Sequence, residues 1–274
     1  MLLFMAEEEI DLRELINVLL RRKYIIMGIT LMAILIAGVI SCAVLSPVYK
    51  SSATFKIARI DGKLLFDISD VENRIKSDNI LQEVNNELGL KIAFTKLSGF
   101  IKTDKMDNSG YVTVSAEYGS PEKARDIVLS VVNKFIEINQ PYYQEQAELL
   151  EKERKSIEKQ IELEKENMEE VEKLRLNILK SEDLSLTEKQ MQINLLLNYS
   201  IQIRENYNEL VEKYFILENQ ILNSSNFELI KYPSIPQAPI KPNKKLNLAI
   251  SGVLGLFLGV FTAFFTEFWQ SGKQ

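Results

Sequence analysis

Residues 24–49 have the sequence YIIMGITLMAILIAGVISCAVLSPVY, a run of 26 amino acids without a charge. A second uncharged run, LNLAISGVLGLFLGVFTAFFT, occupies residues 246–266 near the other end of the chain. A helix of about 20 apolar residues is long enough to cross a hydrocarbon core of about 30 Å. Both runs reach that length, so we expect transmembrane helices at residues 24–46 and 246–266 rather than buried core helices.

A short amphipathic segment precedes the first run. Residues 10–23 have the spacing of a helix, with Asp11 and Glu14 placed as a capping box at its start. The basic cluster Arg21-Arg22-Lys23 follows and abuts the apolar run. By the positive-inside rule, this cluster places residues 1–23 in the cytoplasm.

The first run could instead be a cleaved leader, because the sequence around Cys42 resembles a lipoprotein signal. The 23 residues ahead of the run are too many and too acidic for a signal peptide, and apolar residues continue beyond Cys42. We therefore expect an intact span in which Cys42 is an inert small residue.

Two spans form a hairpin that leaves residues 47–232 outside the cytoplasm and returns residues 267–274 to it as a short tail. The lysines before the second run conflict with this orientation (Lys241, Lys244 and Lys245). We favour the hairpin because the first span usually dominates and a long translocated domain weakens the rule for later spans.

The external segment is expected to combine a small α/β base with a long helical arm. Alternating β-formers predict strands at 48–57, 111–118 and 227–230. Ser69 and Glu72 predict a helix over about 70–88 that Gly89 ends. A further helix is expected to start at Ser120-Pro121.

The arm is predicted at about residues 142–222 as an antiparallel helical hairpin. Pro141 is expected to kink the first helix or to begin a new segment. Ser181 to Ser185 interrupt the pattern, and Ser185 with Glu188 restarts it. The expected apolar stripes are Ile157, Ile161, Met168, Val171 and Ile178 on one helix and Leu196, Tyr199, Ile203, Tyr207, Leu210, Tyr214, Leu217 and Ile221 on the other.

Proline recurs every third residue in the segment 233–245, at Pro233, Pro236, Pro239 and Pro242. Polyproline II has three residues per turn, so the four rings are predicted to share one edge of a semi-rigid spacer.

Three glycines mark one side of the second run, namely Gly252, Gly255 and Gly259. The last two form a GxxxG pattern, which permits close approach of another helix. The partner could be the first span of the same chain, a second subunit or another protein.

Composition excludes several classes of function. The chain has no histidine and one cysteine, which excludes Ser-His-Asp and Cys-His catalysis, imidazole metal sites and an intramolecular disulfide. The net charge of −5 argues against a nucleic-acid partner, and no phosphate-binding Gly-rich loop is present. The acidic residues of the arm could hold a carboxylate pair for glycoside chemistry, but a charged helix is usually a solvated face. We therefore expect no catalytic residues, cofactor or metal.

Together these features resemble the chain-length determinant (Wzz) family of polysaccharide co-polymerases. The matching residues are 9–15 with Arg21-Arg22-Lys23, the strand from Tyr49 to Ile57, and the proline run followed by a glycine-bearing span.

The resemblance implies an α+β membrane protein of the bacterial inner membrane, with two transmembrane helices flanking a periplasmic α/β base and a long helical arm. It implies ring-shaped homo-oligomers without a catalytic site. Such proteins set the length of O-antigen or a related glycan together with a membrane-embedded Wzy-type polymerase. It also implies that the face formed by Gly252, Gly255 and Gly259 contacts the polymerase or a sibling subunit, and that the growing lipid-linked polysaccharide is a possible partner.

Two alternatives come from other classes. A related branch of the family serves capsule or exopolysaccharide export and couples to a tyrosine autokinase, either fused or separate. The few residues after the second span disfavour that coupling. A chemoreceptor-like sensor would need a cytoplasmic output module, which we do not find.

Overall fold

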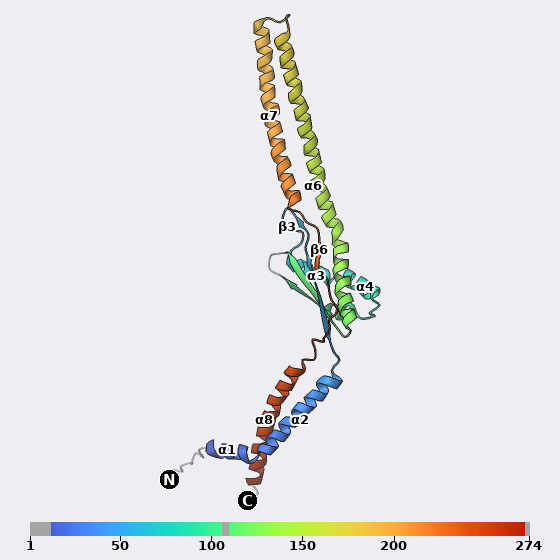
Figure 1. Cartoon of the computed structure of the whole chain (residues 1–274), viewed down its shortest axis with the longest axis vertical. Coiled ribbons are helices and arrows are strands. Elements are labelled where there is room, and N and C mark those ends of the chain that lie inside the picture. The colour runs from blue at the N-terminus through green and yellow to red at the C-terminus, as the bar shows by residue number, and fades with distance from the viewer. Residues whose placement is uncertain (1–11, 106–109, 272–274) are drawn as a thin grey trace, which may run out of the picture. The chain divides into compact units, whose positions relative to one another are not determined.

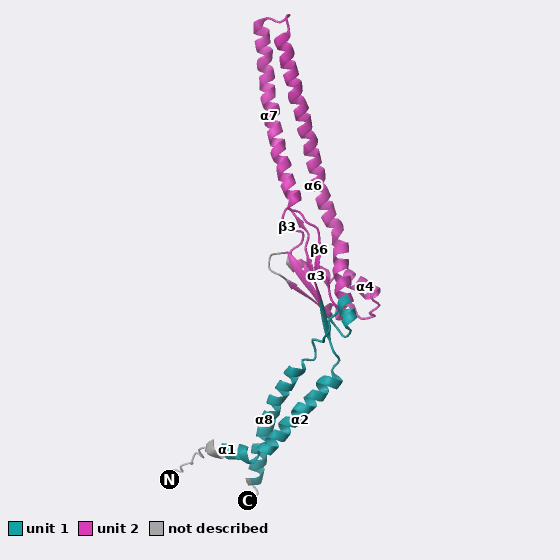
Figure 2. Ribbon diagram, in the orientation of Figure 1, with its two compact units in different colours: residues 1–51, 117–125, 235–274 teal, residues 52–116, 126–234 magenta. Residues whose placement is uncertain are grey.

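The computed structural model describes residues 12–105 and 110–271, and these form two compact units (Figure 2). The first, here called the helix-pair unit, comprises residues 1–51, 117–125 and 235–274. The second, here called the arm unit, comprises residues 52–116 and 126–234. The predicted capping residue Asp11 lies outside the described residues.

The helix-pair unit contains α1 (Leu12–Arg21), α2 (Lys23–Val39), a π-helical turn η1 (Ile40–Val44) and α8 (Lys244–Ser271). Among the described residues, α2 continued by η1 and α8 are long and apolar enough to cross a membrane. Most of their large apolar side chains are exposed, as expected of helices that lipid covers. Cys42 is an exposed free cysteine in η1.

A sheet with the strand order β4-β5-β1-β6 forms the base of the fold. The strands are β1 (Tyr49–Lys56), β4 (Ile101–Lys105), β5 (Tyr111–Tyr118) and β6 (Glu228–Lys231), and β1 pairs antiparallel with β6, as β4 does with β5. A short hairpin of β2 (Arg59–Ile60) and β3 (Lys63–Leu64) forms a separate two-stranded sheet. The predicted strands correspond to β1, β5 and β6, while β2, β3 and β4 were not predicted.

Aromatic and branched side chains fill the core between this sheet and the first turns of α6 (Pro121–Lys180). Phe135 of α6 lies with its ring centroid 5.2 Å from that of Phe55 and 5.8 Å from that of Phe227. Phe55 and Phe135 are fully buried. The core therefore joins β1, the start of the arm and the segment that enters β6.

The helix predicted over 70–88 is two helices, α3 (Ile68–Ile75) and α4 (Asp78–Glu87). In one continuous helix Ile75 and Ile80 would lie about 140° apart around the axis, at about 100° per residue. A break at Ser77, which adopts an extended conformation with ψ 148°, lets both side chains be buried. The N-cap of α3 is Asp67 instead of the predicted Ser69. The helix α5 (Phe94–Phe100) was also not predicted.

The arm is a hairpin of α6 and α7 (Leu186–Leu222), which lie side by side in Figure 1. This confirms the predicted arm, although α6 runs through Pro141 without beginning a new segment. The predicted stripes are buried or half-buried with one exception: Tyr199 is 51% exposed, and the half-buried Ser200 takes its place. With Ser200 the α7 stripe alternates regularly in steps of four and three, which keeps it on one face.

Two polar contacts fix the arm at its turn and along its length. At the turn, the Glu188 amide donates to Ser185 Oγ at 3.3 Å and the Ser185 amide donates to Glu188 Oε2 at 2.9 Å, so the predicted capping box is confirmed. The Ser185 hydroxyl and amide lower the pKa of the Glu188 carboxyl. Along the arm, Arg154 of α6 donates to Tyr214 Oη of α7 at 3.0 Å. The hydrogen bond to Glu151 raises the pKa of Arg154 the most, and the hydrogen bond to Tyr214 raises it further.

We expect Ser185→Ala to loosen the start of α7, because an N-cap hydroxyl contributes about 1 kcal/mol to a helix. Amide hydrogen exchange of the full chain should become about fivefold faster in the first turns of α7. Ser156→Ala, in the middle of α6, is the matched control and should leave that exchange unchanged. Equal protection in both variants would show that the capping box contributes nothing.

Candidate functional site

The candidate site is the face of α8 that packs against α2. A Cβ atom added at Gly255 would lie 2.8 Å from Ala33 Cβ and 3.0 Å from Thr30 Cα. At Gly259 it would lie 2.9 Å from Ile26 Cα and 3.0 Å from the Ile26 carbonyl oxygen. Real Cβ atoms do not approach so closely, so glycine at these two positions is what brings the helix backbones together.

The third predicted glycine has a looser environment. A Cβ atom at Gly252 would lie 3.6 Å from Ile34 Cδ1, which is an ordinary van der Waals contact. Of the partners considered for the glycines, the described contacts are with the first span of the same chain. Contact of this face with a polymerase or a sibling subunit stays a prediction.

Polar contacts hold the two ends of this helix pair. At one end, Arg22 Nε donates to Glu267 Oε2 at 2.9 Å and Arg21 Nη1 to Glu267 Oε1 at 3.2 Å. Gln270 accepts a further hydrogen bond from Arg22. These contacts make α2 and α8 antiparallel and put residues 21–22 beside residues 267–270.

At the other end, Asn247 Nδ2 donates to Ser41 Oγ at 2.6 Å, and Ser41 is buried. Neither end contact was predicted from the sequence. A single acidic residue in the last turn of an apolar helix, opposite a basic cluster before the other helix, was the signal that could have indicated the Glu267 contact.

The proline-rich segment departs from a straight polyproline II helix. Residues 237–238 form a bend, and the Lys241–Pro242 peptide is cis. Pro233 is buried in the arm unit, whereas Pro236, Pro239 and Pro242 belong to the helix-pair unit.

Pairing with Val48, the residue before β1, explains the departure from a straight helix. The Val48 amide donates to the Lys241 carbonyl at 3.1 Å, and the Ile240 amide donates to the Val48 carbonyl at 2.8 Å. Lys241 Nζ also donates to Glu117 Oε2 at 2.6 Å. The end of the segment is thus attached to Val48, which precedes β1, and to Glu117 of β5.

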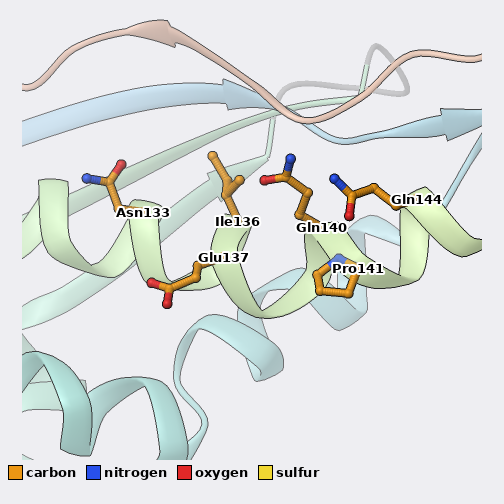
Figure 3. A pocket seen from close by; sticks show the side chains of 6 residues that line it. All are labelled: Asn133, Ile136, Glu137, Gln140, Pro141 and Gln144. Carbon is orange, nitrogen blue, oxygen red and sulfur yellow. The ribbon is translucent and has the colours of Figure 1, made fainter.

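A shallow cavity of about 470 Å³ runs along α6 (Figure 3). Its lining is one face of the helix: Asn133, Ile136, Glu137, Gln140, Pro141 and Gln144. Glu137 forms an ion pair with Lys134 at 2.8 Å. Such a row of amides suits hydrogen bonding to a polar surface. Within residues 12–105 and 110–271, no cluster of three acidic or cysteine side chains is placed to hold a metal ion.

Comparison with known proteins assigns a family to the N-terminal part of the chain. Residues 8–88 match the model of the Wzz family, described as chain length determinant protein. The range contains α1, α2, β1, α3 and α4, and therefore both the first candidate span and part of the base. This region is a Wzz chain length determinant domain, which confirms the resemblance noted in the sequence.

Two proteins of Bacillus subtilis (strain 168) are similar to the chain. The uncharacterized protein YveK is 28% identical over 138 residues, which are 47% of this chain and 59% of that protein. The probable capsular polysaccharide biosynthesis protein YwqC is 27% identical over 139 residues, 47% of this chain and 56% of that protein. The matched region thus spans less than two thirds of either relative.

A solved structure of a full-length bacterial polysaccharide co-polymerase is also similar. It is 14% identical, and the alignment covers 95% of this chain and 99% of that chain with a TM-score of 0.46.

We expect Gly255→Leu and Gly259→Leu to separate α2 from α8, because each new side chain would meet backbone atoms of α2. Gly28→Leu is the matched control, since a Cβ there meets nothing within 4 Å. The measurement is disulfide formation between Ser41→Cys and Asn247→Cys in a Cys42→Ala background. Cross-linking should be fast in the parent and the control and at least tenfold slower in the glycine variants. Equal rates in all of them would contradict the close packing.

Proposed function

We propose that the protein is a non-catalytic polysaccharide co-polymerase that regulates the chain length of a surface glycan. The Wzz domain at residues 8–88 carries this proposal, and the antiparallel pair of apolar helices supports it. A capsular-type polysaccharide is the favoured glycan, because one similar protein is named for capsular polysaccharide biosynthesis. An O-antigen or similar lipopolysaccharide glycan has less support.

In this proposal α2 and α8 span the bacterial cell membrane, with both termini in the cytoplasm and the arm unit outside. The Arg22–Glu267 contact supports it, because it sets the start of α2 and the last turns of α8 at the same end of the helix pair. The basic residues 21–23 favour the cytoplasm for that end.

Partners in this proposal are further copies of the chain, a membrane-embedded glycan polymerase and the growing lipid-linked glycan. Exposed apolar side chains near the tip of the arm support contacts with other copies. Leu186 is 87% exposed, Met191 67% and Leu197 57%. Large exposed apolar side chains of this kind can take part in protein–protein contacts.

The test is the glycan size distribution on a gel, from cells that lack the gene and from cells in which it is restored. We expect deletion to replace a clustered distribution of lengths with a broad one, and restoration to recover the cluster. Restoration with Gly28→Leu should also recover it, and restoration with Gly255→Leu and Gly259→Leu together should not. Loss of the surface glycan altogether would indicate an export or kinase-coupled role, and an unchanged distribution would refute the proposal.

A further inference from the structure

Lysines gather where α8 begins. Lys244 and Lys245 form its first turn, and both are exposed. Lys241 lies three residues earlier, and its pairing with Val48 places it near Lys50. We call these four lysines, Lys50, Lys241, Lys244 and Lys245, the lysine collar.

The protein itself neutralises one member of the collar. Glu117 binds Lys241, with Nζ and Oε2 2.6 Å apart. In the part of the chain that the structure describes, Lys50, Lys244 and Lys245 form no ion pair. The start of α6 belongs to the same unit and adds one acidic and two basic residues, Glu122, Lys123 and Arg125. The net charge of the collar and these residues together is therefore positive.

This placement is unfavourable without a negatively charged partner. Cations on the outer side of a span oppose the positive-inside rule. Lysines in the first turn of a helix also face the positive end of its dipole, and the first turn of α8 holds no acidic residue. At the other end of the pair, by contrast, Glu267 already binds Arg21 and Arg22.

In the hairpin proposed above, the collar lies just beyond the outer end of the helix contact, where a lipid headgroup would lie. Lys244 is about one helical turn before Asn247, whose hydrogen bond to Ser41 marks the outer end of the helix contact. Below it, the apolar side chains of both helices are exposed, including Val39 at 63% and Val253 at 55%. The lysine collar is therefore next to an exposed apolar surface.

We propose that the lysine collar binds the phosphate headgroup of a membrane lipid on the outer face of the membrane. Phosphate oxygens accept charge-assisted hydrogen bonds from lysine ammonium groups. The acyl or prenyl chains of the same lipid would cover the apolar surface below, which a soluble anion would not. The inference rests on the membrane-spanning hairpin that we propose above.

The experiment measures lipid binding to the purified full chain in detergent by native mass spectrometry. The probes are phosphatidylglycerol, zwitterionic phosphatidylcholine and a polyprenyl diphosphate, each added separately. We expect the wild-type chain to prefer the anionic lipids. A lysine near a membrane surface contributes roughly fivefold to such binding, so Lys244→Gln with Lys245→Gln should weaken it roughly 30-fold.

Lys155→Gln with Lys159→Gln is the matched control, because it removes the same charge from exposed positions of α6 in the arm unit. It should bind lipid like the wild type. The cross-link between Ser41→Cys and Asn247→Cys, formed at the parent rate, confirms that the collar variant keeps the helix pair.

Equal binding of phosphatidylcholine and phosphatidylglycerol to the wild type would overturn the proposal, and so would wild-type affinity in the collar variant. Displacement of the lipid by an equal concentration of inorganic pyrophosphate would also overturn it, since the ligand would then be a soluble anion. Tighter binding of either anionic lipid supports the proposal and identifies which lipid is preferred. Binding is measured without any glycan, so its failure is distinct from failure of the glycan-length test.

Discussion

The approach of α8 to α2 at Gly255 and Gly259 constrains the rest of the helix-pair unit. Because the two backbones come so close, the helices have one antiparallel register, which the Arg22–Glu267 and Asn247–Ser41 contacts fix at either end. The same register brings the chain that follows α2 beside the N-terminal end of α8. Val48 can therefore pair with Lys241 there, and Glu117 can bind the Lys241 ammonium group. A side chain at either glycine would disturb all of these contacts together.

The arm is stabilised by other contacts than the helix-pair unit. Its helices bury one narrow stripe and leave most of their surface exposed, so tertiary burial per residue is small. Polar contacts supply the rest of the arm's stability. They are the capping box at Ser185, the i,i+3 pairs such as Arg175–Glu172, and the Arg154 contacts that reach Tyr214 on the other helix. An arm built this way keeps large exposed surfaces, which suits a protein that we propose to assemble with copies of itself.

Local patterns in the sequence predicted the elements that depend on neighbouring residues. The strand at Tyr111–Tyr118, the start of α6 at Pro121 and the capping box at Ser185 follow from such patterns and are confirmed. The break at Ser77 was missed because the shift in helical phase between Ile75 and Ile80 was read as one apolar face. The contacts of Glu267, Asn247 and Lys241 join residues more than 100 positions apart, so no local pattern could specify them. The glycines were found from their spacing, which left three partners open, and the structure shows their contacts with the first span.

The membrane-spanning hairpin is the central claim, and single-cysteine labelling in intact cells tests it most directly. Two chains are compared in a Cys42→Ala background, one with Lys159→Cys on the arm and one with Ser271→Cys at the end of α8. A maleimide that cannot cross the membrane should label the first chain in intact cells and the second only after permeabilisation. Labelling of both chains in intact cells, or of the second alone, would contradict the hairpin and the cytoplasmic placement of its ends.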